Sequence, residues 1–284
     1  MRKALRWAGF GLAGLLALLL IAALAIFAIS ETALRKKHEA QAERLQAPDT
    51  ARLAEAPQMA AVHGCTSCHG AGLAGKMMDI PAFVARAIAP NLPAIAAKAS
   101  DQQLAAAIRQ GIGHDGRALY IMPSAQYSRL TDAEVATLVA WIRSLPAVPG
   151  LAGKVKPGPM GRIGMVFGSF GSVRELVPVY RAQLPVAIAG HEPGRHLAAT
   201  ACAECHGPAL AGQDNPFGPA PDLAVAAGYD LAQFTALMRR GVTPGGNKLG
   251  LMGEVARDDF VHLRDEQIAA LHAYLTARAK LSGG

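Results

Sequence analysis

All four cysteines of this chain lie in two copies of one pattern, Cys-x-x-Cys-His, at residues Cys65–His69 and Cys202–His206. The pattern is typical of covalent haem attachment. Two thiols one helical turn apart can each add to a vinyl group on one edge of a porphyrin, and the adjacent imidazole can then ligate the iron. We therefore predict two covalently attached haem c groups. The attaching thiols would be Cys65, Cys68, Cys202 and Cys205, and the iron-ligating histidines His69 and His206.

Other uses of paired cysteines explain these segments less completely. Two Cys-x-x-Cys pairs could form a structural zinc site, but zinc does not require a histidine directly after each pair. A thioredoxin-like redox pair would need a βαβ pattern near one motif, and none surrounds either copy. Disulfides can form in an oxidising compartment, but they leave both histidines unexplained.

The two motifs begin an internal repeat, which is in keeping with a length of 284 residues and about two domains. The matched segments are Ala89–Leu92 with Ala220–Leu223, Arg109–Gly111 with Arg239–Gly241, and Leu130–Asp132 with Leu263–Asp265. Each copy ends in a run with apolar residues three and four positions apart, opened by a capping Asp or Thr, which predicts an amphipathic helix. Helical runs joined by Gly- and Pro-rich loops, with no strand pairs, predict an all-α module.

The repeat also indicates a second axial ligand for each iron. Met122 and Met252 each lie eleven residues after a repeated glycine, Gly111 and Gly241. A thioether suits iron in an electron-transfer site, and His/Met ligation raises the reduction potential. Methionine is more often a core residue, but the other methionines lack a repeated position, so we predict Met122 and Met252 as ligands. For the remaining histidines a surface or capping role is the simpler interpretation: His63, His114, His191, His196, His262 and His272.

Two further pairs of residues could support the haem sites. The unligated nitrogen of a haem histidine normally donates to a carbonyl. Pro90 and Pro221 have no backbone N–H, but they offer free carbonyls at matching positions, and we expect these to orient the two ligand histidines. Arg109 and Arg240 could pair with haem propionates, although a solvent-facing helical arginine is an equally good interpretation.

The N-terminal segment predicts a membrane anchor. Residues 8–29 form an uncharged apolar run that follows three basic side chains, and a helix of about that length spans a bilayer core. A cleaved signal peptide is the alternative, since small residues stand near the end of the run, but the apolar region of a signal peptide is usually only about 7 to 15 residues long. Residues 31–56 are rich in charged helix formers, which predicts a solvated helical stalk.

The formal charge of +7 is unevenly distributed. Residues 1–47 carry seven basic and three acidic side chains, and residues 151–195 carry six and two. This argues against a nucleic-acid-binding domain and suits acidic headgroups, an acidic partner or a solvated linker. The predicted organisation is a transmembrane anchor (1–30), a stalk (31–56), a first domain (57–149), a Gly- and Pro-rich connector that interrupts any helical period (150–193) and a second domain (194–284). A connector of that size usually packs on something or carries function.

Several short segments accompany the haem motif. They are Cys-x-x-Cys-His-Gly, Ala-Pro-Asn-Leu, Arg-x-Gly, Met-Pro-Ser and a final Leu-Thr-Asp helix that ends in Trp-Ile-Arg-Ser-Leu-Pro. With these segments the module resembles class I cytochrome c over about residues 57–148 and 194–278. It is similar to the membrane-bound cytochrome c subunits of periplasmic alcohol, aldehyde and gluconate dehydrogenases. Those subunits typically carry three such modules, whereas this chain has two.

The resemblance implies haem attachment in the exported compartment of bacteria, so that both domains would face the periplasm from a single-pass anchor in the inner membrane. It also implies a relay of single electrons from a periplasmic donor, such as a dehydrogenase, to a quinone- or oxidase-linked acceptor of the respiratory chain. With both irons six-coordinate, neither offers a vacant position for substrate chemistry. The main alternative is a dihaem enzyme, such as a peroxidase, with one open or switchable iron. A free-standing dihaem carrier, an oxidase-linked cytochrome and a binding subunit whose connector docks a large partner are further alternatives.

Overall fold

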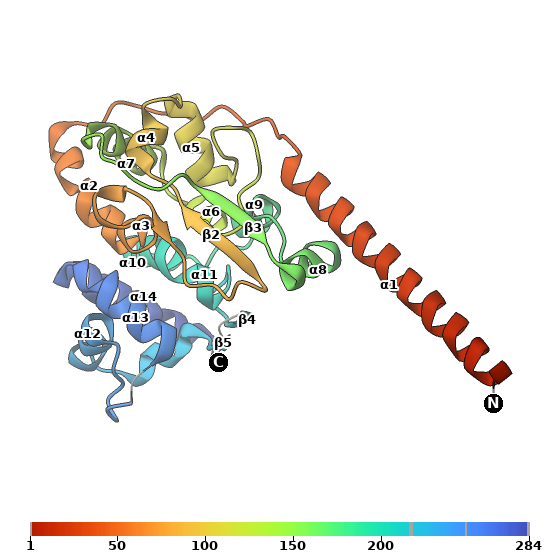
Figure 1. Ribbon diagram of the computed structural model, residues 1–284. Helices are drawn as coiled ribbons and strands as arrows, with labels where there is room; N and C mark the ends of the chain where they lie inside the picture. Colours follow the sequence, from red (N-terminus) through yellow and green to blue (C-terminus); the bar gives the residue numbers. More distant parts are fainter. Residues whose placement is uncertain (1, 216–217, 248, 283–284) are drawn as a thin grey trace.

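The computed structural model of the chain describes residues 2–215, 218–247 and 249–282. Helices hold 60% of the residues and strands 8%, which confirms the all-α class in its main feature. Figure 1 shows two helical modules packed against each other, with one long helix projecting from the body and ending at the N-terminus. The N-terminal apolar segment therefore forms an extended arm, and most of the remaining chain forms a body of two modules.

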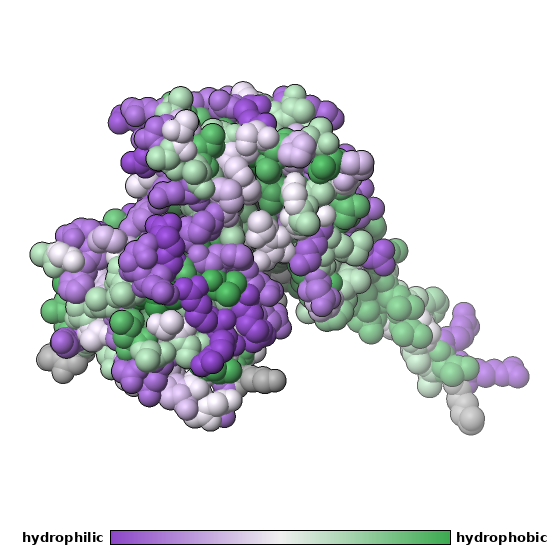
Figure 2. Space-filling model, turned by 90° about the vertical axis from the view of Figure 1, so that its left-hand side faces the viewer, coloured by the Kyte–Doolittle hydropathy of each residue, from purple (hydrophilic) through white to green (hydrophobic). Residues whose placement is uncertain are grey.

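The projecting arm is helix α1, Arg2–Arg35. Within the described residues it is the one helix long and apolar enough to cross a membrane, and no residue of its most apolar stretch is buried in the folded chain. Figure 2 shows it as an apolar rod with hydrophilic side chains at its free end. An anchor and a signal sequence share this length and composition, and exposed apolar surface of this extent calls for a lipid environment.

The charged segment after α1 differs from the predicted helical stalk. The helix ends at Arg35, residues 38–49 contain no helix, and α2 begins only at Thr50. The prediction was wrong because this segment bonds to the first module instead of to itself. The backbone N–H of Gln41 donates to the Gln110 side chain at 2.8 Å, and the carboxylate of Glu43 is buried.

The first module is a helical unit closed by its first and last helices, since α2 packs against α7. Two helices begin with a capping box: the Ser100 hydroxyl accepts from the backbone of Gln103, and Thr131 pairs in the same way with Glu134. The box at Thr131 is the predicted start of the closing helix. The helices of this module are α2 (Thr50–Val62), α3 (Cys65–His69), α4 (Leu92–Ala96), α5 (Asp101–Gln110), α6 (Ser124–Tyr127) and α7 (Asp132–Ser144), with a 3-10 turn, η1, at Ala71–Leu73.

The second module repeats this plan, since its first helix packs against its last. A Cβ on Gly194 of the first helix would lie only 2.1 Å from the Ala270 carbonyl oxygen, so the crossing requires glycine. The buried core includes Phe234, Leu271 and Tyr274. Its helices are α10 (Glu192–Leu197), a π-helical turn η2 (Ala198–Cys202), α11 (Ala203–His206), η3 (Leu223–Gly228), α12 (Leu231–Arg240), α13 (Gly250–Asp258), η4 (Phe260–His262) and α14 (Asp265–Ser282).

Short strands are present in both modules, so the prediction that strand pairs are absent was wrong. In the first module β1 (Lys76–Met77), β2 (Ala85–Ala89) and β3 (Lys154–Pro157) form an antiparallel sheet in the order β1-β2-β3. In the second, β4 (Gln213–Asn215) pairs with β5 (Gly218–Ala220). Strands β2 and β5 each end directly before the proline of the repeated Ala-Pro segment. Strands this short carry little periodicity to detect in a sequence.

The connector is structured as well. It supplies β3 to the sheet of the first module and then forms α8 (Pro159–Phe167) and α9 (Val173–Ala182). The prediction that its prolines and glycines exclude helices was wrong because Pro159 lies in the first turn of α8, where a missing N–H costs nothing, and Gly158 and Gly168 flank that helix. The expectation that a connector of this size packs on something is confirmed, since α8 contacts α1 and α9 contacts α6.

One arginine holds the connector and both modules together. Arg129 follows α6, and its guanidinium donates to the carbonyl of Tyr180 at 2.7 and 3.0 Å and to that of Gln183 at 2.9 Å. It also donates to Ala199 at 3.2 Å and to Pro208 at 2.9 Å in the second module. Burial lowers the pKa of Arg129 to about 10, so the group stays protonated at neutral pH. A cation with these acceptors fixes three segments at once.

Replacing this guanidinium should loosen the junction. Arg129→Met leaves four carbonyls without this donor, and we expect a loss of roughly 3 kcal/mol in the free energy of unfolding, since bonds from charged donors contribute about 1.5 to 3 kcal/mol each. Denaturant unfolding of the detergent-solubilised chain measures this. Arg117→Met is the control, because Arg117 is exposed and pairs with Asp115 only at 3.7 Å. Equal stability of the two variants would contradict the role of Arg129.

Candidate functional site

Each Cys-x-x-Cys-His segment forms a short helix followed by the same tight loop. The backbone N–H of Gly75 donates to the carbonyl of His69 at 2.8 Å, and that of Gly212 donates to His206 at 2.9 Å. Within these loops Leu73 and Leu210 have positive φ angles of 53° and 63°. Such angles are unfavourable for leucine, and both side chains are almost completely buried, so packing compensates the backbone strain.

The two histidines of the motifs are oriented by the predicted proline carbonyls. His69 Nδ1 lies 2.8 Å from the carbonyl oxygen of Pro90, and His206 Nδ1 lies 2.8 Å from that of Pro221. A carbonyl accepts only, so each Nδ1 is the donor and each Nε2 keeps its lone pair for a metal. Burial lowers the pKa of both imidazoles, although the bond to the carbonyl opposes this, and the neutral form is the one that ligates iron.

The residue after each proline secures this geometry. Asn91 accepts from the backbone N–H of Ala94 at 2.9 Å and caps α4, while its amide donates to Val148 at 2.7 Å. Asp222 accepts from Ala224 at 2.7 Å, and Arg278 donates to its carboxylate at 2.6 Å. The sequence showed these two residues within a repeated motif but gave them no role; their position beside the proline was the available signal.

The predicted methionines lie at equivalent places. In the first module the N–H of Leu119 donates to Gly111 at 2.8 Å, and in the second that of Leu249 donates to Gly241 at 3.3 Å. Both glycines end a helix in the left-handed conformation, and each methionine follows three residues after the leucine. Beyond these leucines, the secondary structure around the two methionines differs. Met122 stays in a loop before α6, whereas Met252 lies in the first turn of α13.

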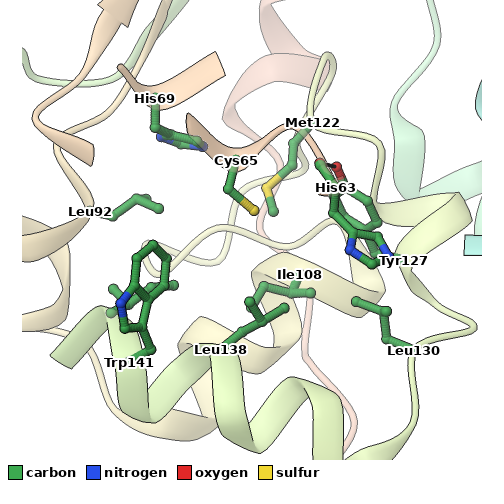
Figure 3. A pocket seen from close by; sticks show the side chains of 11 residues that line it. His63, Cys65, His69, Leu92, Ile108, Met122, Tyr127, Leu130, Leu138 and Trp141 are labelled. Atoms are coloured by element: carbon green, nitrogen blue, oxygen red, sulfur yellow. Dashed lines mark hydrogen bonds between the residues drawn. The ribbon is translucent and has the colours of Figure 1, made fainter. Parts of the chain in front are cut away.

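An apolar cavity in the first module brings three of the predicted residues together. Cys65, His69 and Met122 line it, and Figure 3 shows the sulfur atoms of Cys65 and Met122 pointing into one space, with the His69 ring at its edge. The rest of the lining is almost entirely apolar: Leu92, Ile108, Tyr127, Leu130, Leu138, Trp141 and Ile142, together with His63. A soft thioether, an imidazole and an attaching thiol around an apolar space fit a haem held by Cys65, Cys68, His69 and Met122.

His63 is the other histidine of this cavity. Its Nδ1 lies 2.8 Å from the Met59 carbonyl, its ring packs against Tyr127, and its buried Nε2 has no hydrogen-bond partner among the residues that the structure describes. Burial lowers the pKa of His63, so its ring is neutral. His114, by contrast, is exposed, and its carbonyl accepts from Gln103. His114 therefore does not line the cavity, although it lies close to Met122 in the sequence.

Within the described residues no disulfide joins the four cysteines. Burial raises the pKa of Cys65 and of Cys202 to about 12, and it raises the pKa of Cys68 and Cys205 as well. Zinc binds thiolates. In residues 2–215, 218–247 and 249–282 no three His, Cys, Asp or Glu side chains are grouped to hold a metal ion, so the two pairs do not combine into a zinc site.

The arginines predicted to contact propionates have other positions. Arg109 donates to the carboxylate of Glu43 and pairs with Asp132 at 2.8 Å, so it ties the segment after α1 to the start of α7. Its counterpart in the second module is Arg239, which pairs with Asp265 at 2.8 Å, and not the predicted Arg240. The Arg240 side chain is exposed at the end of α12. The buried partner, Glu43, lies 66 positions from Arg109, which is why the motif alone did not reveal it.

The haem-attachment segment of each module contacts the other module in a matching way. The Ser67 hydroxyl, two residues after the first cysteine of its motif, donates to Asp259. The equivalent residue of the other motif, Glu204, donates its backbone N–H to Gln126 at 2.6 Å. Gln126 and Asp259 are themselves equivalent, because each stands four residues before the repeated leucine of its module. The two modules therefore meet about a pseudo-twofold axis that brings the attachment segments to the shared interface.

A polar cleft between the modules contains an ion pair that reports on their docking. His196 Nε2 of α10 lies 2.8 Å from the carboxylate of Glu134 on α7. Figure 2 shows hydrophilic side chains gathered along this junction. Burial alone would raise the pKa of Glu134, but the hydrogen bond and charge of His196, together with the hydrogen bonds from Thr131, outweigh it and lower the pKa to about 2. The same bond raises the pKa of His196.

These shifts predict a pH dependence of stability. The raised pKa of His196 stabilises the folded chain fully below its unfolded value of about 6.5 and loses this effect as the pH rises through the folded pKa. The lowered pKa of Glu134 stabilises the folded chain above the pKa that this carboxyl has in the unfolded chain. This contribution is lost only in strong acid. We expect the stability advantage of the wild type over His196→Gln to be largest near pH 6 and to shrink toward pH 8.5, measured by denaturant unfolding. An advantage that is independent of pH, or one shared by His114→Gln, would contradict this.

Two helical modules, each with a Cys-x-x-Cys-His segment whose buried histidine is held by a proline carbonyl, define a c-type haem protein. The Cytochrome c family model matches residues 53–146 and 191–278, and the chain belongs to this family. No individual curated protein matches the chain. Cytochrome c domains bind haem c covalently, and two such domains correspond to two haems and to haem-based electron transfer.

Proposed function

We propose that the chain is a membrane-anchored periplasmic dihaem cytochrome c. It relays single electrons from a periplasmic donor, which we propose to be a dehydrogenase, to the respiratory chain. The observation that carries this proposal is the pseudo-twofold junction at Ser67 and Glu204, where both attachment segments contact the opposite module. Haem c supplies a site that gains and loses one electron without bond formation to a substrate. Contact of both attachment segments with the opposite module favours transfer within the chain.

The protein residues have separate tasks in this relay. The carbonyls of Pro90 and Pro221 hold the ligand histidines, and the apolar lining around Met122 excludes water. A site with two protein ligands and a dry surrounding needs little rearrangement when its charge changes by one, which suits fast electron exchange. Arg129 and the Glu134–His196 pair keep the two modules at a constant separation.

The same arrangement argues against a peroxidase. Met122 lines the cavity together with His69, and Met252 lies at the repeated sequence position in the first turn of α13, which supports a thioether as the second axial ligand in each module. An enzyme that binds peroxide would need one of these positions open. The relay therefore uses both modules in the same way.

Removing a thioether should open one iron. We expect Met122→Ala to bind carbon monoxide at one of two haems after reduction and to lose one of two sulfur-to-iron absorption bands in the ferric state, whereas the wild type binds none. Absorption spectroscopy measures both. Met77→Ala, at an exposed methionine, is the control. Carbon monoxide binding or peroxide turnover by the wild type would sink the relay proposal in favour of the peroxidase.

The donor is tested in the native membrane. Mild detergent extraction of the tagged full-length chain, followed by mass spectrometry, should yield a periplasmic dehydrogenase, and substrate of that enzyme should reduce both haems in the complex. The same extraction of the Arg129→Met variant is the matched comparison. This substitution alters the junction between the modules and leaves both sets of proposed ligands in place. A chain that carries fewer than two haems, or whose haems no co-purifying enzyme reduces, would contradict the proposal.

A further inference from the structure

Helix α8 of the connector lies beside the end of the apolar arm. The guanidinium carbon of Arg162 lies 4.3 Å from the centre of the Phe27 ring of α1. The same guanidinium donates to the Ser30 hydroxyl at 2.7 Å and pairs with Glu31 at 3.1 Å. Because Phe27 belongs to the last turns of the apolar run, α8 stands at the level where a spanning α1 would leave the hydrocarbon. Figure 1 shows α8 next to α1 and away from the second module.

The outer face of α8 is apolar. Met160, Ile163 and Phe167 share one side of the helix, three and four residues apart, and are 55%, 37% and 77% exposed. The opposite side is committed to the protein, since a Cβ on Gly161 would lie 2.1 Å from the Val84 carbonyl oxygen. The helix therefore cannot turn to bury these side chains in its own module.

Positive charge surrounds this apolar face. The segment 151–174 holds four basic residues and no acidic one. Lys154 and Lys156 of β3 and Arg86 of β2 are exposed, and Arg86 stands directly opposite Lys156 in the antiparallel register. Like charges in opposite positions repel each other. Within the described part of the chain these three side chains make no ion pair, so an external anion would relieve the repulsion.

We propose that α8 and the exposed face of β2–β3 form a lipid-binding surface that docks the first module on a bilayer rich in anionic phospholipid. Met160, Ile163 and Phe167 enter the boundary between headgroups and acyl chains, while Lys154, Lys156 and Arg86 contact the phosphate layer. Strand β2 leads directly into Pro90, whose carbonyl holds His69. Docking therefore fixes the first haem site relative to the membrane. This inference rests on α1 acting as an uncleaved anchor.

The test uses the full-length chain in nanodiscs with a photoreactive p-benzoylphenylalanine at Phe167, at Ile163 or, as control, at Val225. Val225 is also exposed, at 53%, but it lies in the second module. After illumination, we expect at least about fivefold more lipid adduct at the two α8 positions than at Val225 in anionic bilayers. Lys154→Gln with Lys156→Gln should lower that yield in anionic bilayers and not in zwitterionic ones.

The result that overturns the inference is equal lipid labelling at α8 and at Val225 in discs that hold the intact chain. In native membranes, a protein adduct in place of a lipid adduct at Phe167 would likewise overturn it and identify α8 as a protein-docking site. Intact mass is measured on every sample. An intact mass that lacks residues 1–30 would show that the anchor is cleaved, which would overturn this inference. Haem content and reduction by dithionite test the proposed electron relay separately.

Discussion

The guanidinium of Arg129 is the interaction on which the arrangement of both modules depends. A partly buried cation without a carboxylate partner is costly unless several acceptors surround it. Here the acceptors are carbonyls of α9 and of the residues on both sides of the second haem motif, Ala199 and Pro208. One side chain of the first module thus defines where the second motif lies. The Ser67–Asp259 and Gln126–Glu204 contacts then follow from a pseudo-twofold junction.

The two modules share a backbone plan and differ in the way the chain enters the haem motif. In the first, Gly64 ends α2 with a left-handed turn before Cys65. In the second, α10 continues into a π-helical turn that contains Cys202. Despite this, both histidines reach a proline carbonyl at 2.8 Å. The histidine geometry is therefore set by the loop after the motif, which is the same in both copies, and not by the helix before it.

The proposed ligand sets follow from the sequence alone because they depend on local spacing and on repetition. Cys-x-x-Cys-His places its groups on one helical turn, and the eleven residues from Gly111 to Met122 recur from Gly241 to Met252. The stalk, the connector and Arg109 could not be predicted in the same way. Glu43 lies 66 positions from Arg109, and Arg162 lies 131 from Glu31. No local pattern indicates pairs at that separation, and composition alone suggested solvated charge.

The sequence by itself determined two Cys-x-x-Cys-His motifs, the residues proposed as iron ligands, the helical modules and an apolar arm. These properties reside in residue types and short spacings, which the chain carries whatever its tertiary arrangement. Only the tertiary structure decided how the two sites face each other, that the connector joins the first module as a strand and two helices, and that α8 lies against the arm. Those features come from buried polar contacts between distant segments, whose partners are chosen when the chain packs.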